Sequence, residues 1–301
     1  MEQTLATASP ERIRGVTLVF AAGVLWSTVG LGIRLIEEAL VWQILLYRSL
    51  SLSVLLYIVI RLRSGADPFL LAARLGWPGV VAALALVGAY SGGIYAIQTT
   101  SVANAMLLFA TAPLMAAILA RIVLGEAVQR RTWIAMGVAG IGVAIMVWDK
   151  FGGAALGGNL AAIGSSLGFA VFTVALRRGR AGDMMPAVFL SGVFAIFMMG
   201  ALCLLMGLPL VLSPADGGIA LGMGIFQIGA GLILFTLGSR SVPAAELTLL
   251  SMAEVVLGPF WVWLFLGETA TGYTIAGGTV LLAAIAGNAL AGARRKPPPI
   301  M

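Results

Sequence analysis

The sequence of 301 residues has no histidine and a single cysteine, and only 10% of its residues are charged. Histidine is the usual proton carrier near neutral pH and the commonest metal ligand, so its absence excludes a Ser-His-Asp triad. Cys203 has no second cysteine with which to form an internal disulfide. Ordinary soluble domains carry about 25% charged residues. These absences argue against an enzyme and against a single soluble core, and we expect no catalytic residues, no metal and no cofactor.

Long apolar stretches fill most of the chain. Hydrophobic residues make up 60% of it, and the mean hydropathy is +1.05. A helix of about 20 apolar residues is long enough to cross a bilayer. Ten such stretches occur, at residues 15–33, 39–60, 77–97, 102–124, 132–148, 156–176, 186–207, 217–238, 243–266 and 272–291. The longest gap between them, residues 61–76, is too short for a soluble domain. The sequence therefore predicts an all-α membrane protein with ten transmembrane helices.

The basic residues favour one side of this predicted membrane protein. With the N-terminus inside the cell, fifteen arginines and lysines lie on the cytoplasmic side, only Arg34 and Lys150 lie on the other, and Arg48 is left within a span. This distribution follows the positive-inside rule. It predicts a multi-pass protein of the bacterial inner membrane with both termini in the cytoplasm. The net charge of +6 therefore reflects topology, and we expect no nucleic-acid partner.

The chain contains an internal repeat. Residues 119–147 resemble residues 262–290, because each has a span that ends in Leu-Gly-Glu, a short polar link and a span rich in glycine and alanine. Glu126 and Glu268, which are expected to order these links, are 142 positions apart, and the same offset aligns the first predicted span with the sixth. Five spans per repeat is an odd number, so the second repeat is inverted, with Glu126 inside and Glu268 outside. Inverted repeats are the architecture from which many secondary transporters build alternating access.

This repeat defines the predicted organisation of the chain. A cytoplasmic leader covers residues 1–14, and the first five-helix repeat covers residues 15–148. The second, inverted repeat covers residues 156–291, and a basic cytoplasmic tail covers residues 292–301. No separate soluble domain is expected.

Three segments carry a resemblance to a known family. They are LWSTVG in the first span, TAPLMAAILARIVLGE in the fourth and SMAEVVLGPFWVWLFLGE in the ninth. With spans arranged as five plus five, residues 15–291 resemble the EamA-type branch of the drug/metabolite transporter superfamily, and within it bacterial exporters of aromatic and other neutral amino acids. The resemblance implies that spans 3, 4, 8 and 9 line a central cavity between the two inverted repeats, and that spans 5 and 10 buttress it. One departure is Val255, which stands where the first repeat has Pro113.

A charged residue lies deep in each of two predicted spans. Arg48 is near the middle of the second span, and Glu254 is near the middle of the ninth. A charge at the centre of a transmembrane helix costs about 2.5–3.5 kcal/mol, and it usually faces the interior with a partner. We therefore expect these two side chains either to form an ion pair or to bind the carboxylate and the ammonium of a substrate. Glu254 and Glu246 are also candidates for carrying a coupling proton.

Other polar and aromatic residues at depth complete the predicted substrate site, because polar side chains inside a membrane must find partners or line water. They are Trp26, Tyr90, Tyr95, Gln98, Asn104, Gln227 and Trp261. Glycines crowd the third and eighth spans, where small residues either let helices pack closely or permit bending. The candidate hinges are Gly92, Gly93, Gly229 and Gly231.

Together these features predict a secondary transporter that exports amino acids with aromatic or hydrophobic side chains by alternating access. Its partners would be this small-molecule substrate and the lipid bilayer, with the protein a monomer or a homodimer. A nucleotide-sugar or other metabolite exchanger of the same superfamily is the first alternative, although anionic substrates favour several deep cations. An intramembrane enzyme or a non-transporting assembly subunit is the alternative from another class, but the chain has no histidine and no credible nucleophile.

Overall fold

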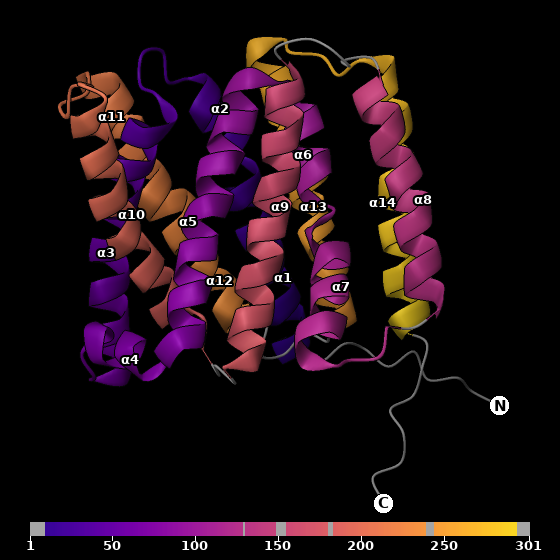
Figure 1. The fold of residues 1–301 in the computed structure, drawn as a ribbon, viewed down its shortest axis with the longest axis horizontal. Coiled ribbons are helices and arrows are strands. Elements are labelled where there is room, and N and C mark those ends of the chain that lie inside the picture. The colour runs from indigo at the N-terminus through magenta and orange to yellow at the C-terminus, as the bar shows by residue number, and fades with distance from the viewer. Residues whose placement is uncertain (1–9, 129, 149–154, 180–182, 239–243, 294–301) are drawn as a thin grey trace, which may run out of the picture.

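The computed structural model describes residues 10–128, 130–148, 155–179, 183–238 and 244–293 (Figure 1). Throughout this part of the chain, every regular element is a helix, which confirms the predicted all-helical class. The elements are α1 Pro10–Ser27, α2 Val29–Arg34, α3 Val41–Ser64, α4 Pro68–Arg74, α5 Gly76–Thr99, α6 Val102–Phe109, α7 Ala112–Leu124, α8 Arg130–Trp148, α9 Ala155–Arg178, α10 Met185–Leu205, α11 Pro214–Gly222, the π-helical η1 Met223–Ala230, α12 Gly231–Gly238, α13 Ala244–Leu266 and α14 Gly272–Ala293.

Seven helical segments of the described residues are long and apolar enough to cross a membrane. They are Ile13–Arg34, Val41–Ser64, Gly76–Thr99, Val102–Leu124, Leu156–Arg178, Met185–Leu205 and Pro214–Gly238. The three remaining predicted spans fall on α8, α13 and α14, and within α13 Ala253–Leu266 is a shorter apolar helix. The structure therefore supports a multi-pass membrane protein, while the count of ten spans and their inversion stay predictions.

The long helices stand side by side, with their ends at two opposite edges of the molecule (Figure 1). The short helix α4 lies at one edge, between α3 and α5. Its first turn is set by Pro68 and by Asp67, whose side chain accepts a 2.8 Å hydrogen bond from the Phe69 amide. Gly65 ends α3 with a φ of 66°, a conformation that glycine adopts without steric cost. The gap at residues 61–76 between predicted spans thus contains a helix.

Three of the seven segments depart from a regular α-helix inside the bundle. The first breaks at Thr28 between α1 and α2, and the fourth breaks at Ala110 and Thr111 between α6 and α7. The last contains the π-helical η1. Thr28 and Thr111 each donate a 2.7 Å hydroxyl hydrogen bond to a carbonyl three residues earlier. Irregular backbone at membrane depth occurs where it is buried in protein or lines water, so these breaks point to the interior of the bundle.

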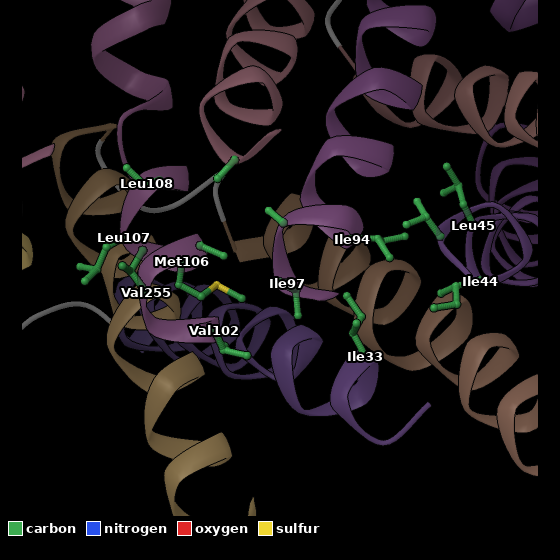
Figure 2. Packing of buried hydrophobic residues seen from close by; sticks show 14 of the residues in the cluster. Ile33, Ile44, Leu45, Ile94, Ile97, Val102, Met106, Leu107, Leu108 and Val255 are labelled. Atoms are coloured by element: carbon green, nitrogen blue, oxygen red, sulfur yellow. The ribbon is translucent and has the colours of Figure 1, made fainter. Parts of the chain in front are cut away.

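Two apolar clusters form the core. The first, part of which is drawn in Figure 2, includes Ile33 of α2 and Val255 of α13. The second includes Leu52 of α3 and Phe189 of α10. Lipid tails are as apolar as these side chains, so the clusters stabilise the bundle through close packing. Tyr90 of α5 packs against both clusters and therefore marks the level at which they meet.

Helices α8 and α14 form a pair at one edge of the bundle (Figure 1). Their backbones meet at two glycines, since a Cβ on Gly142 would lie 2.6 Å from the Gly277 carbonyl oxygen. Small residues permit this approach. α14 in turn contacts α13 and α6. The last helix of each predicted repeat thus packs against its counterpart.

Candidate functional site

Arg48 is buried within α3, with only 3% of its surface exposed. Its guanidinium carbon lies 4.5 Å from the centre of the Tyr90 ring on α5, a cation–π contact worth about 0.5–2 kcal/mol. The Nη2 atom of Arg48 has no hydrogen-bond partner in the part of the chain that the structure describes. Removing an ion from water costs several kcal/mol, which is more than this contact contributes. The deep cation is therefore only partly compensated.

The Arg48–Glu254 ion pair, one of the two alternatives expected for these residues, is not formed in this structure. It is not among the ion pairs of the described residues, and the helices that carry the two residues have different neighbours. α3 packs mainly against α10, α11, η1 and α5, whereas α13 packs mainly against α1, α2, α6 and α14. Equal depth along two helices does not imply contact across the bundle.

The position of Arg48 depends on a close approach between α3 and η1. A Cβ on Gly224 would lie 2.2 Å from the Arg48 carbonyl oxygen and 2.0 Å from the Ser51 hydroxyl oxygen. Ser51 also donates a 2.8 Å hydrogen bond to the Leu221 carbonyl. A larger residue in place of Gly224 would push the two helices apart. This glycine therefore sets the packing behind the arginine.

The two acidic candidates on α13 are described to different extents. Glu254 is half-buried, and its side chain makes no hydrogen bond or ion pair with the described residues. Val255, next in the chain, packs in the first apolar cluster. Glu246 also lies on α13, but its side chain is outside the described residues. The coupling roles of both glutamates stay predictions.

Three predicted residues meet at the break between α1 and α2. Gln227 of η1 donates from Nε2 to the Trp26 carbonyl at 3.3 Å, and Trp261 of α13 donates from Nε1 to Ser27 Oγ at 2.8 Å. The Trp26 ring lies 5.3 Å from the ring of Phe235, centroid to centroid. The Oε1 atom of Gln227 is buried and finds no partner among the residues that the structure describes. The break therefore gathers two indoles and an unused amide acceptor from three helical segments.

Tyr95 and Gln98 lie nearer the end of α5 than Tyr90 does. At 1.5 Å per residue, Gln98 is about 12 Å beyond Tyr90 along the helix axis. Its Nε2 atom donates to the Ala39 carbonyl at 3.1 Å, and Tyr95 is 42% exposed. Both residues line a pocket of about 410 Å³ that also includes Glu37, Glu38 and Trp42. These two residues therefore belong to one end of the bundle, apart from the level of Arg48.

Asn104 lies in a buried amide network between α6 and α9. Its Nδ2 atom donates to Asn159 Oδ1, and Thr100 Oγ1 donates to the same oxygen at 3.2 Å. Asn104 Oδ1 and Asn159 Nδ2 are buried and have no partners within the described ranges. Asn159 was not among the predicted residues, although its polarity inside a predicted span was a usable signal. The structure places Asn104 in a contact between helices.

All four candidate hinge glycines lie at close helix contacts. A Cβ on Gly92 or Gly93 would meet α9. On Gly229 it would meet α3, and on Gly231 it would meet the Trp26 indole. α5 continues as an α-helix through its glycine pair, whereas Gly229 lies within η1. Close packing accounts for all four positions, and the hinge role stays a prediction.

Two ion pairs join helix ends in the described part of the chain. Arg34 Nε lies 2.9 Å from Glu268 Oε2, and Arg177 at the end of α9 pairs with Glu126 just after α7. The glutamates were expected at helix links, but their arginine partners were not predicted. A usable signal was that Arg34 is one of only two basic residues assigned to the external side.

Two of the polar groups inside the bundle combine an unused polar atom with aromatic rings. Arg48 with Tyr90 supplies an unused cationic donor, and Gln227 with the indoles of Trp26 and Trp261 supplies an unused acceptor beside aromatic surfaces. Within the described residues, no group of three or more histidine, cysteine, aspartate or glutamate side chains could hold a metal ion. The arrangement suits recognition of a carboxylate, a polar donor and an apolar or aromatic group.

Comparisons with known proteins bear on this architecture. A model of the EamA-like transporter family matches residues 13–148 and 156–290. One solved structure, titled only "Crystal structure of protein", is similar with a TM-score of 0.63 and 20% identity, over 93% of this chain and 98% of that one. At this identity the likeness shows the fold alone. The comparison with curated proteins gives no match.

Proposed function

Because the chain belongs to the EamA-like transporter family, we propose that it is a secondary transporter that exports amino acids with aromatic or hydrophobic side chains. Family membership makes the protein a membrane transporter, in keeping with its multi-pass helical fold. The choice of substrate rests on one observation above all. The Nη2 atom of Arg48 is buried and has no hydrogen-bond partner among the described residues.

A substrate carboxylate would satisfy this donor. Hydrogen bonds between a guanidinium and a carboxylate are short and about twice as strong as neutral ones. An ionised group that is removed from water without a partner is costly, so Arg48 gains most from a small anionic group. In this proposal the carboxylate binds Nη2 of Arg48 while the Tyr90 ring supports the guanidinium.

The rest of an amino acid matches the second group of side chains. Gln227 Oε1 is an unused buried acceptor, and Glu254 is an acid without a partner among the described residues. Either one suits an ammonium group. Trp26 and Trp261 offer aromatic faces, against which apolar and aromatic side chains pack favourably. The combination favours a zwitterion with an apolar side chain.

Alternating access would use the two repeats that the sequence predicts. Residues 15–148 and 156–291 would lie in opposite orientations around a central cavity, so that each face of the membrane has its own gate. The basic bias would place both termini in the cytoplasm of a bacterial inner membrane. The transporter would act as a monomer or a homodimer, without a metal or a cofactor.

A nucleotide-sugar exchanger is the alternative within the superfamily. Its diphosphate would require several cations at depth, because each phosphate charge must be neutralised away from water. Arg48 is the only buried arginine or lysine of the described residues. We therefore place this alternative second.

Flux into proteoliposomes tests the proposal. Purified protein should transport labelled phenylalanine or leucine, and neutral amino acids should compete while nucleotide sugars do not. Phenylalanine amide provides a matched control, because it keeps the ring and the amine but lacks the carboxylate, and it should compete poorly. Exchange of nucleotide sugars without amino-acid flux would overturn the proposal.

A further inference from the structure

The Arg34–Glu268 and Arg177–Glu126 ion pairs occupy related places in the two predicted repeats. Glu126 and Glu268 are 142 positions apart, and Arg177 is one position past the counterpart of Arg34 under the same offset. In each pair, an arginine at the end of the first span of one repeat meets a glutamate after the fourth span of the other repeat. Both pairs therefore cross from one repeat to the other.

The two pairs lie at opposite edges of the molecule. Figure 1 shows α2 and the connection between α13 and α14 at the upper edge, where Arg34 meets Glu268. The end of α9 and the connection after α7 lie at the lower edge, where Arg177 meets Glu126. Each face of the bundle thus has one ion pair between the repeats.

The Arg34–Glu268 pair also binds the backbone of a third link. Arg34 Nη2 donates to the Thr100 carbonyl at 2.7 Å, and Glu268 Oε1 accepts from the Val102 amide at 2.8 Å. This amide is at the start of α6, where the helix dipole favours a negative charge. The two side chains are only 27% and 25% exposed. The pair therefore ties α2, the α5–α6 link and the α13–α14 link together.

The Arg177–Glu126 pair is more open to solvent. Its side chains are 53% and 42% exposed. Beside it, Arg178 donates a 3.0 Å hydrogen bond to the Val123 carbonyl in the last turn of α7. The corresponding link in the second repeat, between α12 and α13, falls on residues 239–243, which are outside the described residues. Water screens an exposed pair of this kind, so it separates more readily than the Arg34–Glu268 pair.

We propose that these two ion pairs are the latches of the transporter, one for each face. Release of Arg34–Glu268 opens the face that carries Glu268, and release of Arg177–Glu126 opens the opposite face. This inference rests on the proposed alternating-access function, in which each gate must break and reform in every cycle. Because the Arg34–Glu268 latch is the more buried and has more hydrogen bonds, the resting protein favours closure of that face.

Cysteine labelling from each side of sealed vesicles tests the latches. Thr28→Cys, at the break between α1 and α2, is the reporter, in a Cys203→Ala background that removes the only native cysteine. Glu268→Gln should speed labelling by a membrane-impermeant maleimide several-fold from the Glu268 face and slow it from the other. Glu126→Gln is the matched variant at the opposite latch and should do the reverse.

Two further variants make the result decisive. Arg34→Glu combined with Glu268→Arg should recover part of the native labelling pattern, because the pair is restored without the bond to the Val102 amide. Arg34→Gln keeps that bond, and it replaces Glu268→Gln if the latter folds poorly. The latch proposal fails if no single variant changes the labelling, or if a variant changes it equally from both sides of the vesicle.

Labelling needs no substrate, so it separates this inference from the proposed function. If the variants shift the labelling as expected but the native protein carries no amino acid, the latch proposal stands and the substrate proposal fails. If the native protein carries amino acids but no variant shifts the labelling, the substrate proposal stands and the latch proposal fails.

Discussion

Arg34 at the end of α2 contacts a carboxylate and a backbone carbonyl, whereas Arg48 within α3 contacts an aromatic ring and leaves Nη2 without a partner. The side chain of Arg34 is 27% exposed, and the whole of Arg48 is 3% exposed. The arginine with more access to water thus has more partners in the protein. Two consecutive helices of the chain thus hold the same type of side chain in opposite ways.

If folding stability alone decided, the buried Arg48 would have more partners than the more exposed Arg34, because an unpaired charge costs most where water is excluded. Departures from such rules are expected at functional sites. The Arg34 contacts join three parts of the chain, so this arginine serves the fold and the proposed latch. The unused donor of Arg48 is explained if its partner is a substrate carboxylate, as in the proposed site.

Replacing Arg48 should have the largest effect on transport. Arg48→Gln keeps a polar side chain but removes the charge, and a hydrogen bond to a charged group is worth about 1.5–3 kcal/mol. The kcat/KM for amino-acid flux into proteoliposomes should therefore fall by about 10- to 150-fold. Arg48→Lys should recover only part of the loss, because lysine lacks the planar set of donors. Native flux in Arg48→Gln would contradict the carboxylate site.

The stability of two variants should sharpen the contrast between the arginines. Arg48→Gln removes a poorly compensated charge, so its thermal unfolding temperature should stay level or rise. Arg34→Gln leaves Glu268 without its cation, and the free energy of unfolding should fall by about 1–2 kcal/mol, given the partial exposure of the pair. Thermal-shift measurements in detergent compare the two. A greater loss in Arg48→Gln would make Arg48 a structural residue.

Changes at Tyr90 should have the smallest effect. Tyr90→Leu removes the ring beneath the Arg48 guanidinium, and loss of a cation–π contact worth about 0.5–2 kcal/mol predicts a roughly two- to thirtyfold fall in kcat/KM. Tyr90→Phe keeps the ring and should retain most of the flux measured in the same assay. Equal losses in both variants would assign the effect to the hydroxyl group instead.

The helix positions could be predicted because each apolar stretch is long enough to cross a bilayer and ends near charged or turn-forming residues. The break at Thr28 and the π-helical η1 could not. They are local changes in backbone geometry, and the packing around them fixes them, as where Gly224 admits the backbone of α3. The helix α4 was missed because its seven residues are too few to give a clear periodic pattern.

The candidate site could be predicted by residue type but not by grouping. Arg48 and Gln227 stood out as polar residues in apolar spans. Which helices lie side by side is a property of the tertiary fold, and the expected Arg48–Glu254 pair fails for that reason. The same limit hid the Arg34–Glu268 pair, whose members are 234 residues apart in the chain.

The glycine contact between α8 and α14 bears on how the two halves can turn. At Gly142 and Gly277 the two backbones approach directly, and the side chains of Met146 and Leu281 pack beside the contact. A shift between the helices would bring backbone atoms into collision, so we expect α8 and α14 to stay together. Any movement of one predicted repeat against the other would then leave this pair unchanged and would bend or tilt helices elsewhere in the bundle.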